Sequence, residues 1–85
     1  MQIEITSHFA RSYKKLPFDI QEKAKKKELI FRDNPFDSRL KSHKLQGKEH
    51  EVWAFWIDYR YRIKFIFLTK RRVLFLDIGS HSIYQ

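Results

Sequence analysis

Residues 52–79, VWAFWIDYRYRIKFIFLTKRRVLFLDIG, constrain the fold more than any other part of this 85-residue chain. The stretch holds three apolar and aromatic runs, separated by charged breaks at residues 58–60 and 70–72. Runs of Val, Ile, Phe, Tyr and Trp bounded by such breaks are typical of consecutive antiparallel strands. We therefore expect the second half of the chain to form a three-stranded meander.

The middle run carries cations at every second position, namely Arg60, Arg62 and Lys64. Successive side chains of a strand point to opposite faces, so these cations share one face of the sheet. The other face, which we expect to contact the core, carries Tyr61, Ile63, Phe65 and Phe67. In the third run, simple alternation predicts one face with Val73, Phe75 and Asp77. The opposite face would then carry Leu74, Leu76 and Ile78.

The first half of the chain predicts one strand and two helices. Residues 2–5 alternate polar and apolar, which predicts a short strand with Ile3 and Ile5 toward the core. A hydroxyl of Thr6 or Ser7 can cap a helix over residues 7–15. The Leu16-Pro17 break leads into a second helix over residues 17–33, which predicts a helical hairpin.

The second helix is expected to direct Ile20, Ala24 and Phe31 inward, whereas its lysine-rich middle, residues 23–27, forms a solvated face. Asn34-Pro35 ends the helix. Residues 36–51 then predict a polar, irregular, basic loop that Leu40 and Leu45 anchor to the core.

This order of elements predicts a single α+β domain over residues 1–85. Two N-terminal helices would cover one face of a small antiparallel sheet, in the order β-α-α-β-β-β. The opposite face, with Arg62 and Lys64, would be open to a ligand.

Charge and composition narrow the function classes. The net charge of +8 and the pI near 9.9 favour a polyanionic partner: nucleic acid, an acidic protein or an anionic membrane.

The absence of cysteine excludes disulfides and thiolate metal sites, and the four histidines are scattered, so we expect no metal. With only Gly47 and Gly79, no glycine-rich phosphate loop exists, so we expect no small-molecule cofactor. No apolar run approaches the ~20 residues of a membrane span and no signal peptide is apparent, so we expect a cytoplasmic protein.

Metal-free RNA cleavage needs only a base, an acid and a cation, which histidine, tyrosine, lysine and arginine can supply. Such residues occur here in three clusters that could converge on the open sheet face: Lys41, His43, Lys44 and Lys48 in the loop, Arg62 and Lys64 in the middle strand, and His81 and Tyr84 near the end. Each has a simpler interpretation, because Arg62 could be a solvated strand residue, His43 a loop histidine and Tyr84 a packing residue. Trp53, Phe55 and Trp56 are expected to be chiefly core, although one of them could stack on a base if it is exposed.

Five segments spread along the whole chain resemble those of the RelE/ParE superfamily, the toxins of type II toxin–antitoxin systems: FARSYKKLP, DNPF, LKSHKLQGK, YRYRIKF and LDIGSHSIY. The RelE, YafQ and YoeB branches of mRNA interferases are the most similar. The resemblance implies two N-terminal helices on a small antiparallel sheet. It also implies ribosome-dependent, metal-free cleavage of mRNA by 2′-hydroxyl attack, and a cognate antitoxin that neutralises the enzyme.

Transferred residue by residue, the resemblance makes Arg62 the stabiliser of the phosphorane and His81 the general acid or base. His43 matches a loop histidine, and Tyr84 stands near the terminal aromatic that positions the nucleotide. The other cations, expected to bind RNA or the ribosome, are Lys41, Lys44, Lys48, Arg60 and Lys64. Two family lysines fall here on Trp53 and Phe55, so the general base would have to be His43, Lys44 or Glu51.

Two other functions remain open from the sequence. ParE-type toxins share the fold but inhibit DNA gyrase without cleaving RNA. A basic RNA- or ribosome-binding module without enzymatic activity would also explain the charge.

Overall fold

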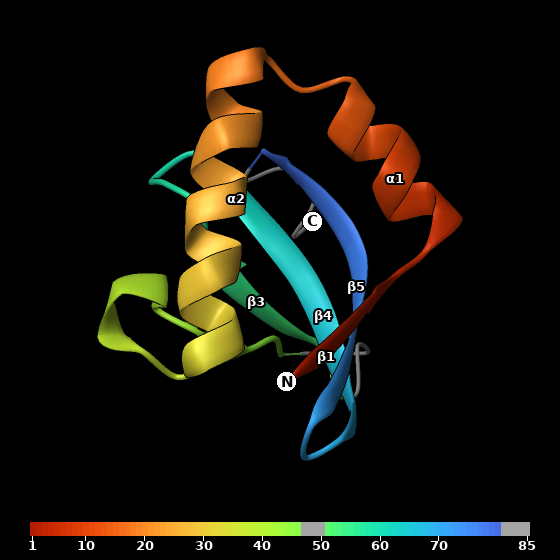
Figure 1. The fold of residues 1–85 in the computed structure, drawn as a ribbon, viewed down its shortest axis with the longest axis vertical. Helices are drawn as coiled ribbons and strands as arrows, with labels where there is room; N and C mark the ends of the chain where they lie inside the picture. The colour runs from red at the N-terminus through yellow and green to blue at the C-terminus, as the bar shows by residue number, and fades with distance from the viewer. Residues whose placement is uncertain (47–50, 81–85) are drawn as a thin grey trace.

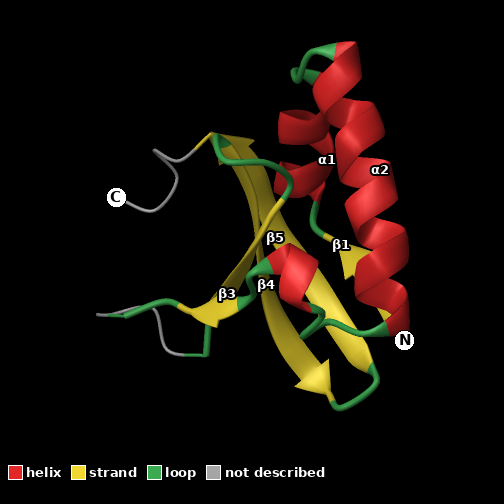
Figure 2. Cartoon of the chain, turned by 90° about the vertical axis from the view of Figure 1, so that its left-hand side faces the viewer, coloured by secondary structure: helices red, strands yellow, loops and turns green. Residues whose placement is uncertain are grey.

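A five-stranded sheet in the order β1-β5-β4-β3-β2 forms the frame of the chain, and two helices lie on one of its faces (Figures 1 and 2). The computed structural model describes residues 1–46 and 51–80. Along the chain the elements are β1 (Gln2–Ile5), α1 (Ser7–Lys14), α2 (Phe18–Asp33), the short 3₁₀ helix η1 (Ser38–Leu40), β2 (His43–Lys44), β3 (Trp53–Trp56), β4 (Tyr61–Thr69) and β5 (Arg72–Ser80). The predicted α+β class, with its helices early and its meander late, is confirmed.

The sheet is mixed, which corrects the expectation of a purely antiparallel sheet. β1 pairs with β5 in parallel, with Ile3 opposite Val73. A parallel pair needs a long connection between its strands, and the chain supplies one through both helices and the intervening strands. The predicted loop over residues 36–51 also contains η1 and the short strand β2, whose His43 pairs with Ala54 of β3.

The helices begin and end close to the predicted residues, because local signals set them. Thr6 caps α1 by accepting a hydrogen bond from the backbone N–H of Phe9 at 2.9 Å, and Pro17 stands at the N-cap of α2. The predicted hairpin is wrong in its packing, because the helices diverge from the turn that joins them (Figure 1). A hollow of about 340 Å³ lies between them, and Ile5 lines it with 53 % of its surface exposed, instead of entering the core.

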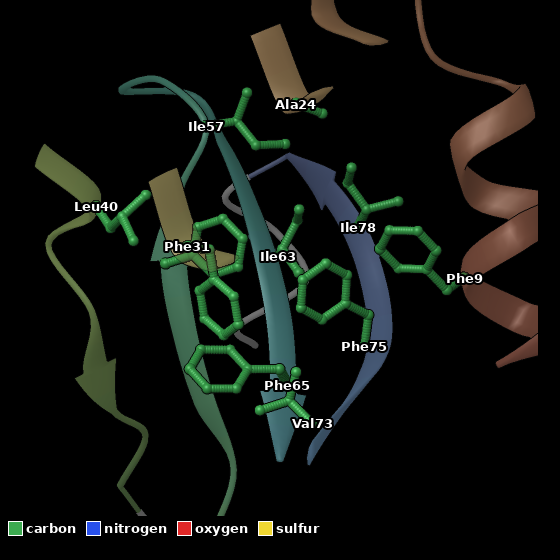
Figure 3. Packing of buried hydrophobic residues seen from close by; sticks show 11 residues of the cluster. Phe9, Ala24, Phe31, Leu40, Ile57, Ile63, Phe65, Val73, Phe75 and Ile78 are labelled. Carbon is green, nitrogen blue, oxygen red and sulfur yellow. The ribbon is translucent and has the colours of Figure 1, made fainter. Parts of the chain in front are cut away.

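The core is an aromatic cluster between α2 and the sheet (Figure 3). Phe31 of α2 is fully buried, and its ring centroid lies 4.8 Å from that of Phe55 and 4.9 Å from that of Phe65. The predicted core face of β4 is confirmed, since Ile63 and Phe65 are buried and Tyr61 and Phe67 are partly buried against the cluster. Ile20, Ala24 and Leu40 are buried as expected.

A β-bulge in β5 overturns the simple alternation expected for the third run. Phe75 pairs with Phe65 and Asp77 with Lys64, so Leu76 is an extra residue without a partner in β4. Because of the extra residue, side chains after the bulge point to the face opposite to the one that simple alternation predicts. Ile78 is therefore buried in the core together with Val73 and Phe75, where alternation would have placed Asp77. The Leu76 carbonyl accepts a hydrogen bond from the Thr6 hydroxyl at 2.9 Å.

Candidate functional site

One face of the sheet is turned away from the helices (Figure 2), and four neighbouring strands, β2 to β5, contribute residues to it. Residues paired across strands share a face, so the strand register defines two rows of side chains. One row runs from Trp56 in β3 through Arg62 in β4 to Gly79 in β5. The next runs through His43, Ala54, Lys64 and Asp77. The structure thus brings His43 of the predicted loop onto the same face as Arg62 and Lys64.

Arg62 is buried on this face, which excludes the simpler interpretation of Arg62 as a solvated strand residue and corrects the expectation that its side chain lies open on the sheet face. Only 4 % of Arg62 is exposed. Its Nη1 donates to the backbone carbonyl of Asp58 at 2.6 Å and to that of Tyr61 at 3.1 Å. Its Cζ lies 3.8 Å from the ring centroid of Trp56. The guanidinium is therefore fixed between the β3–β4 turn and an aromatic ring.

Asp58 builds the turn that holds Arg62. One oxygen of its carboxylate accepts the backbone N–H groups of Arg60 at 2.8 Å and Tyr61 at 2.9 Å, and the other lies 3.4 Å from Lys23 Nζ. Burial raises the pKa of Asp58, but the two backbone donors and the Lys23 ammonium outweigh burial and hold this pKa below its ordinary value. Asp58 is therefore ionised at neutral pH, and its carboxylate braces the turn whose Asp58 carbonyl binds Arg62.

Trp56 contacts a second cation. The sequence suggested a core residue or a base-stacking ring, and neither prediction included a contact with cations. Lys41 Nζ lies 4.4 Å from the ring centroid of Trp56. Lys41 follows η1 in a left-handed conformation (φ 51°, ψ 40°), which costs a residue other than glycine about 1–2 kcal/mol. His43 Nδ1 lies 3.0 Å from the Lys41 carbonyl oxygen. The short break at residues 58–60 predicts a tight turn, and a tight turn would place Trp56 opposite Arg62. That expected pairing could have identified the Trp56 ring as a contact of the arginine.

The other residues predicted for the site, apart from Lys41 and Lys64, do not join Arg62 and His43 in the described part of this face. Lys44 pairs with Trp53, so it falls on the face opposite to His43, and its Nζ lies 3.1 Å from Glu51 Oε1. The expected convergence of the whole loop on one face is therefore wrong for Lys44. Arg60 is exposed in the β3–β4 turn, with its Cζ 5.5 Å from the ring centroid of Tyr59. Lys48, His81 and Tyr84 lie outside the described residues.

Asp77 provides the acidic end of the second row. Its Oδ1 lies 3.3 Å from His8 Nε2 of α1 and accepts the backbone N–H of Ile78 at 2.8 Å. Over residues 1–46 and 51–80, no group of three or more His, Asp or Glu side chains is placed to hold a metal ion. Among the same residues, no helix is long and apolar enough to cross a membrane.

Comparison with solved structures identifies the architecture. YafQ from E. coli strain BL21(DE3) matches with a TM-score of 0.78 and 19 % identity, over 96 % of this chain and 94 % of YafQ. The YoeB/ParE toxin from Agrobacterium tumefaciens matches with a TM-score of 0.78 and 18 % identity, over 95 % of this chain and 99 % of the toxin. RelE in the archaeal RelE–RelB complex from Pyrococcus horikoshii OT3 matches with a TM-score of 0.73 and 13 % identity, over 93 % of this chain and 92 % of that one. No protein-family model and no curated protein sequence matches the chain. At these identities the likeness establishes the fold: the chain has the fold of the RelE-superfamily toxins.

Proposed function

We propose that this chain is the toxin of a type II toxin–antitoxin system and an endoribonuclease that cleaves mRNA on the ribosome. The observation that carries the proposal is the cluster of Lys41, His43, Arg62 and Lys64 on the sheet face opposite the helices. The fold shared with YafQ, YoeB and RelE supports the same conclusion.

The proposed reaction needs one base, one acid and a cationic site. A base removes the proton of a ribose 2′-hydroxyl, and the oxygen attacks the adjacent phosphorus. The bond from phosphorus to the 5′ oxygen then breaks, and an acid protonates that oxygen. In this proposal Arg62 and Lys41 stabilise the negative charge that develops on the phosphate oxygens. His43 is the candidate base on the described part of this face, and the resemblance assigns His81 as acid and Tyr84 as the residue that positions the nucleotide.

The other cations have a binding role in this proposal. Lys64 belongs to the cluster, Arg60 lies in the β3–β4 turn, and Lys44 and Lys48 belong to the segment that follows η1. Such lysines and arginines bind the RNA backbone by releasing its counterions, which makes binding steeply dependent on salt. Mutating one of them is expected to weaken ribosome affinity more than the rate of cleavage.

A cytoplasmic antitoxin is the second proposed partner. RelE and YafQ are each found in a complex with a protein, RelB and DinJ respectively. A surface with a net charge of +8 favours an acidic segment that folds on binding. Expression of the chain together with its neighbouring reading frame should yield a stable complex if this pairing is correct.

The test of the enzymatic proposal is primer extension on mRNA from translating ribosomes. Wild-type protein should produce discrete cuts, and Arg62→Met should reduce cleavage by about 10²–10³-fold, the usual effect of removing one donor to a developing anion. Arg71→Met is the matched control, because Arg71 is an exposed cation in the β4–β5 turn, away from the cluster. Full cleavage by Arg62→Met would refute the site. Intact mRNA with inhibited gyrase would instead identify a ParE-type toxin, and salt-sensitive binding without scission would identify a binding module.

A further inference from the structure

Three separate chain segments meet on the ring of Trp56. Trp56 is the last residue of β3, Arg62 lies directly across from it in β4, and Lys41 reaches it from the turn after η1. Lys41 Nζ lies 4.4 Å from the centroid of this ring, and Arg62 Cζ lies 3.8 Å from it. Both faces of an indole ring are electron-rich and attract cations, so this ring is the feature that the two cationic groups share.

The backbone conformation of Lys41 indicates that its contact with Trp56 has a function in addition to packing. Lys41 adopts a left-handed conformation (φ 51°) that glycine or asparagine would adopt at lower cost. Strain of this kind persists where the surrounding structure requires one particular side-chain position. Here the strained residue places a lysine ammonium over Trp56 and its carbonyl oxygen 3.0 Å from His43 Nδ1.

We propose that Trp56 is a positioning residue that holds Lys41 and Arg62 as one receptor for a single phosphate group. The inference rests on the proposed function, because it assigns this phosphate to the scissile position of the RNA. The arginine offers a planar fork and the lysine a compact charge, which suits different oxygens of one phosphate. In this proposal Trp56 acts through the two cations and not on the substrate itself.

The contact itself is measured by NMR. In the wild type the indole ring current should shift the side-chain methylene protons of Lys41 and Arg62 upfield, and Trp56→Leu should abolish both shifts. Inorganic phosphate is the probe for binding, titrated at constant pH and followed at the same two side chains. Trp56→Leu should weaken this binding about tenfold, an effect within the range of a desolvated cation–π contact. Trp56→Phe, which keeps a smaller aromatic face, should give an intermediate loss.

Trp53→Leu is the matched control. Trp53 belongs to the same strand, but it contacts the rings of Phe36 and Phe67 on the other face of the sheet. Its loss should leave phosphate binding within about twofold of the wild type, since it touches neither cation. Lys41→Met completes a double-mutant cycle: once Lys41 is gone, Trp56→Leu should have a clearly smaller effect than it has in the wild type.

The outcomes separate this inference from the proposed function. Phosphate affinity that is unchanged in Trp56→Leu, although both ring-current shifts are lost, overturns the positioning role. An effect of Trp56→Leu that is undiminished in the Lys41→Met background overturns the shared receptor. If wild-type protein binds phosphate as described and yet leaves mRNA on ribosomes intact, the nuclease proposal fails and the receptor stands. If the wild type cleaves and Trp56→Leu cleaves at the same single-turnover rate, the nuclease stands and the positioning role fails.

Discussion

Removing the hydroxyl of Thr6 should destabilise the protein far more than its place before a short helix suggests. The hydroxyl accepts the backbone N–H of Phe9 and donates to the carbonyl of Leu76, both at 2.9 Å. The first bond caps α1, and the second binds the extra residue of the β5 bulge. One side chain thus joins two elements that lie 70 residues apart in sequence.

The expected magnitude follows from these two bonds. Loss of an N-cap costs about 1 kcal/mol. Leaving a partly buried carbonyl without its donor costs about another 1 kcal/mol. Thr6→Ala should therefore lower the free energy of unfolding by about 2 kcal/mol, which shifts the urea midpoint by about 1–2 M for a small domain. Thr6→Ser keeps the hydroxyl and should cost less than about 0.5 kcal/mol.

Urea unfolding followed by tryptophan fluorescence measures both variants. The decisive quantity is the difference between Thr6→Ala and Thr6→Ser, because only that difference reports the hydroxyl. Equal midpoints for the two variants would refute the claim that these bonds stabilise the fold. Hydrogen exchange adds a local readout, since the backbone N–H of Phe9 should exchange faster in Thr6→Ala than in Thr6→Ser.

Three further predictions concern the core and two carboxylates. Phe31→Ala removes a fully buried ring and should cost about 3–5 kcal/mol, measurable by thermal unfolding. The hydrogen bonds from the Arg39 side chain and backbone lower the pKa of Asp37 to about 2, so an NMR titration should find it there and Arg39→Gln should raise it. Because this pKa is depressed, the Asp37 contribution to stability is complete above its ordinary value of 3.8 and is lost as the pH falls from there through about 2. Asp58→Ala should cost about 1–2 kcal/mol in urea, whereas Asp58→Asn keeps the turn acceptor and should lose only the weaker Lys23 pairing.

The sequence was sufficient where local chemistry decides the structure. Thr6 supplies a cap, Pro17 restricts the backbone at the start of α2, and Asn34 follows the last helical residue. Such signals act within a few residues, so the helix boundaries follow from them. The alternation of apolar and charged residues in β4 likewise reveals its two faces, because one face is buried and the other carries cations.

Local patterns failed where a distant contact decides the structure. In β5 both Leu76 and Ile78 are apolar, so the pattern does not reveal which of them is the extra residue of a bulge. The extra residue is bound from the other end of the chain, since the Thr6 hydroxyl donates to the Leu76 carbonyl. The divergence of the helices and the parallel pairing of β1 are of the same kind, since both depend on how distant segments pack.

The burial of Arg62 changes the chemical interpretation of the site. A solvated arginine is screened by water and must be ordered when a ligand binds, whereas this guanidinium is already held by the backbone carbonyls of Asp58 and Tyr61 and by the ring of Trp56. Desolvating a charge costs free energy that its contacts return only in part, so burial of this kind is a poor way to stabilise a small domain. The same burial is useful for transition-state stabilisation, because a fixed charge in a region of low dielectric acts strongly on a developing anion and needs no reorganisation. Under the proposed function, the cost in stability and the gain in catalysis therefore have one cause, the turn built by Asp58 and the ring supplied by Trp56.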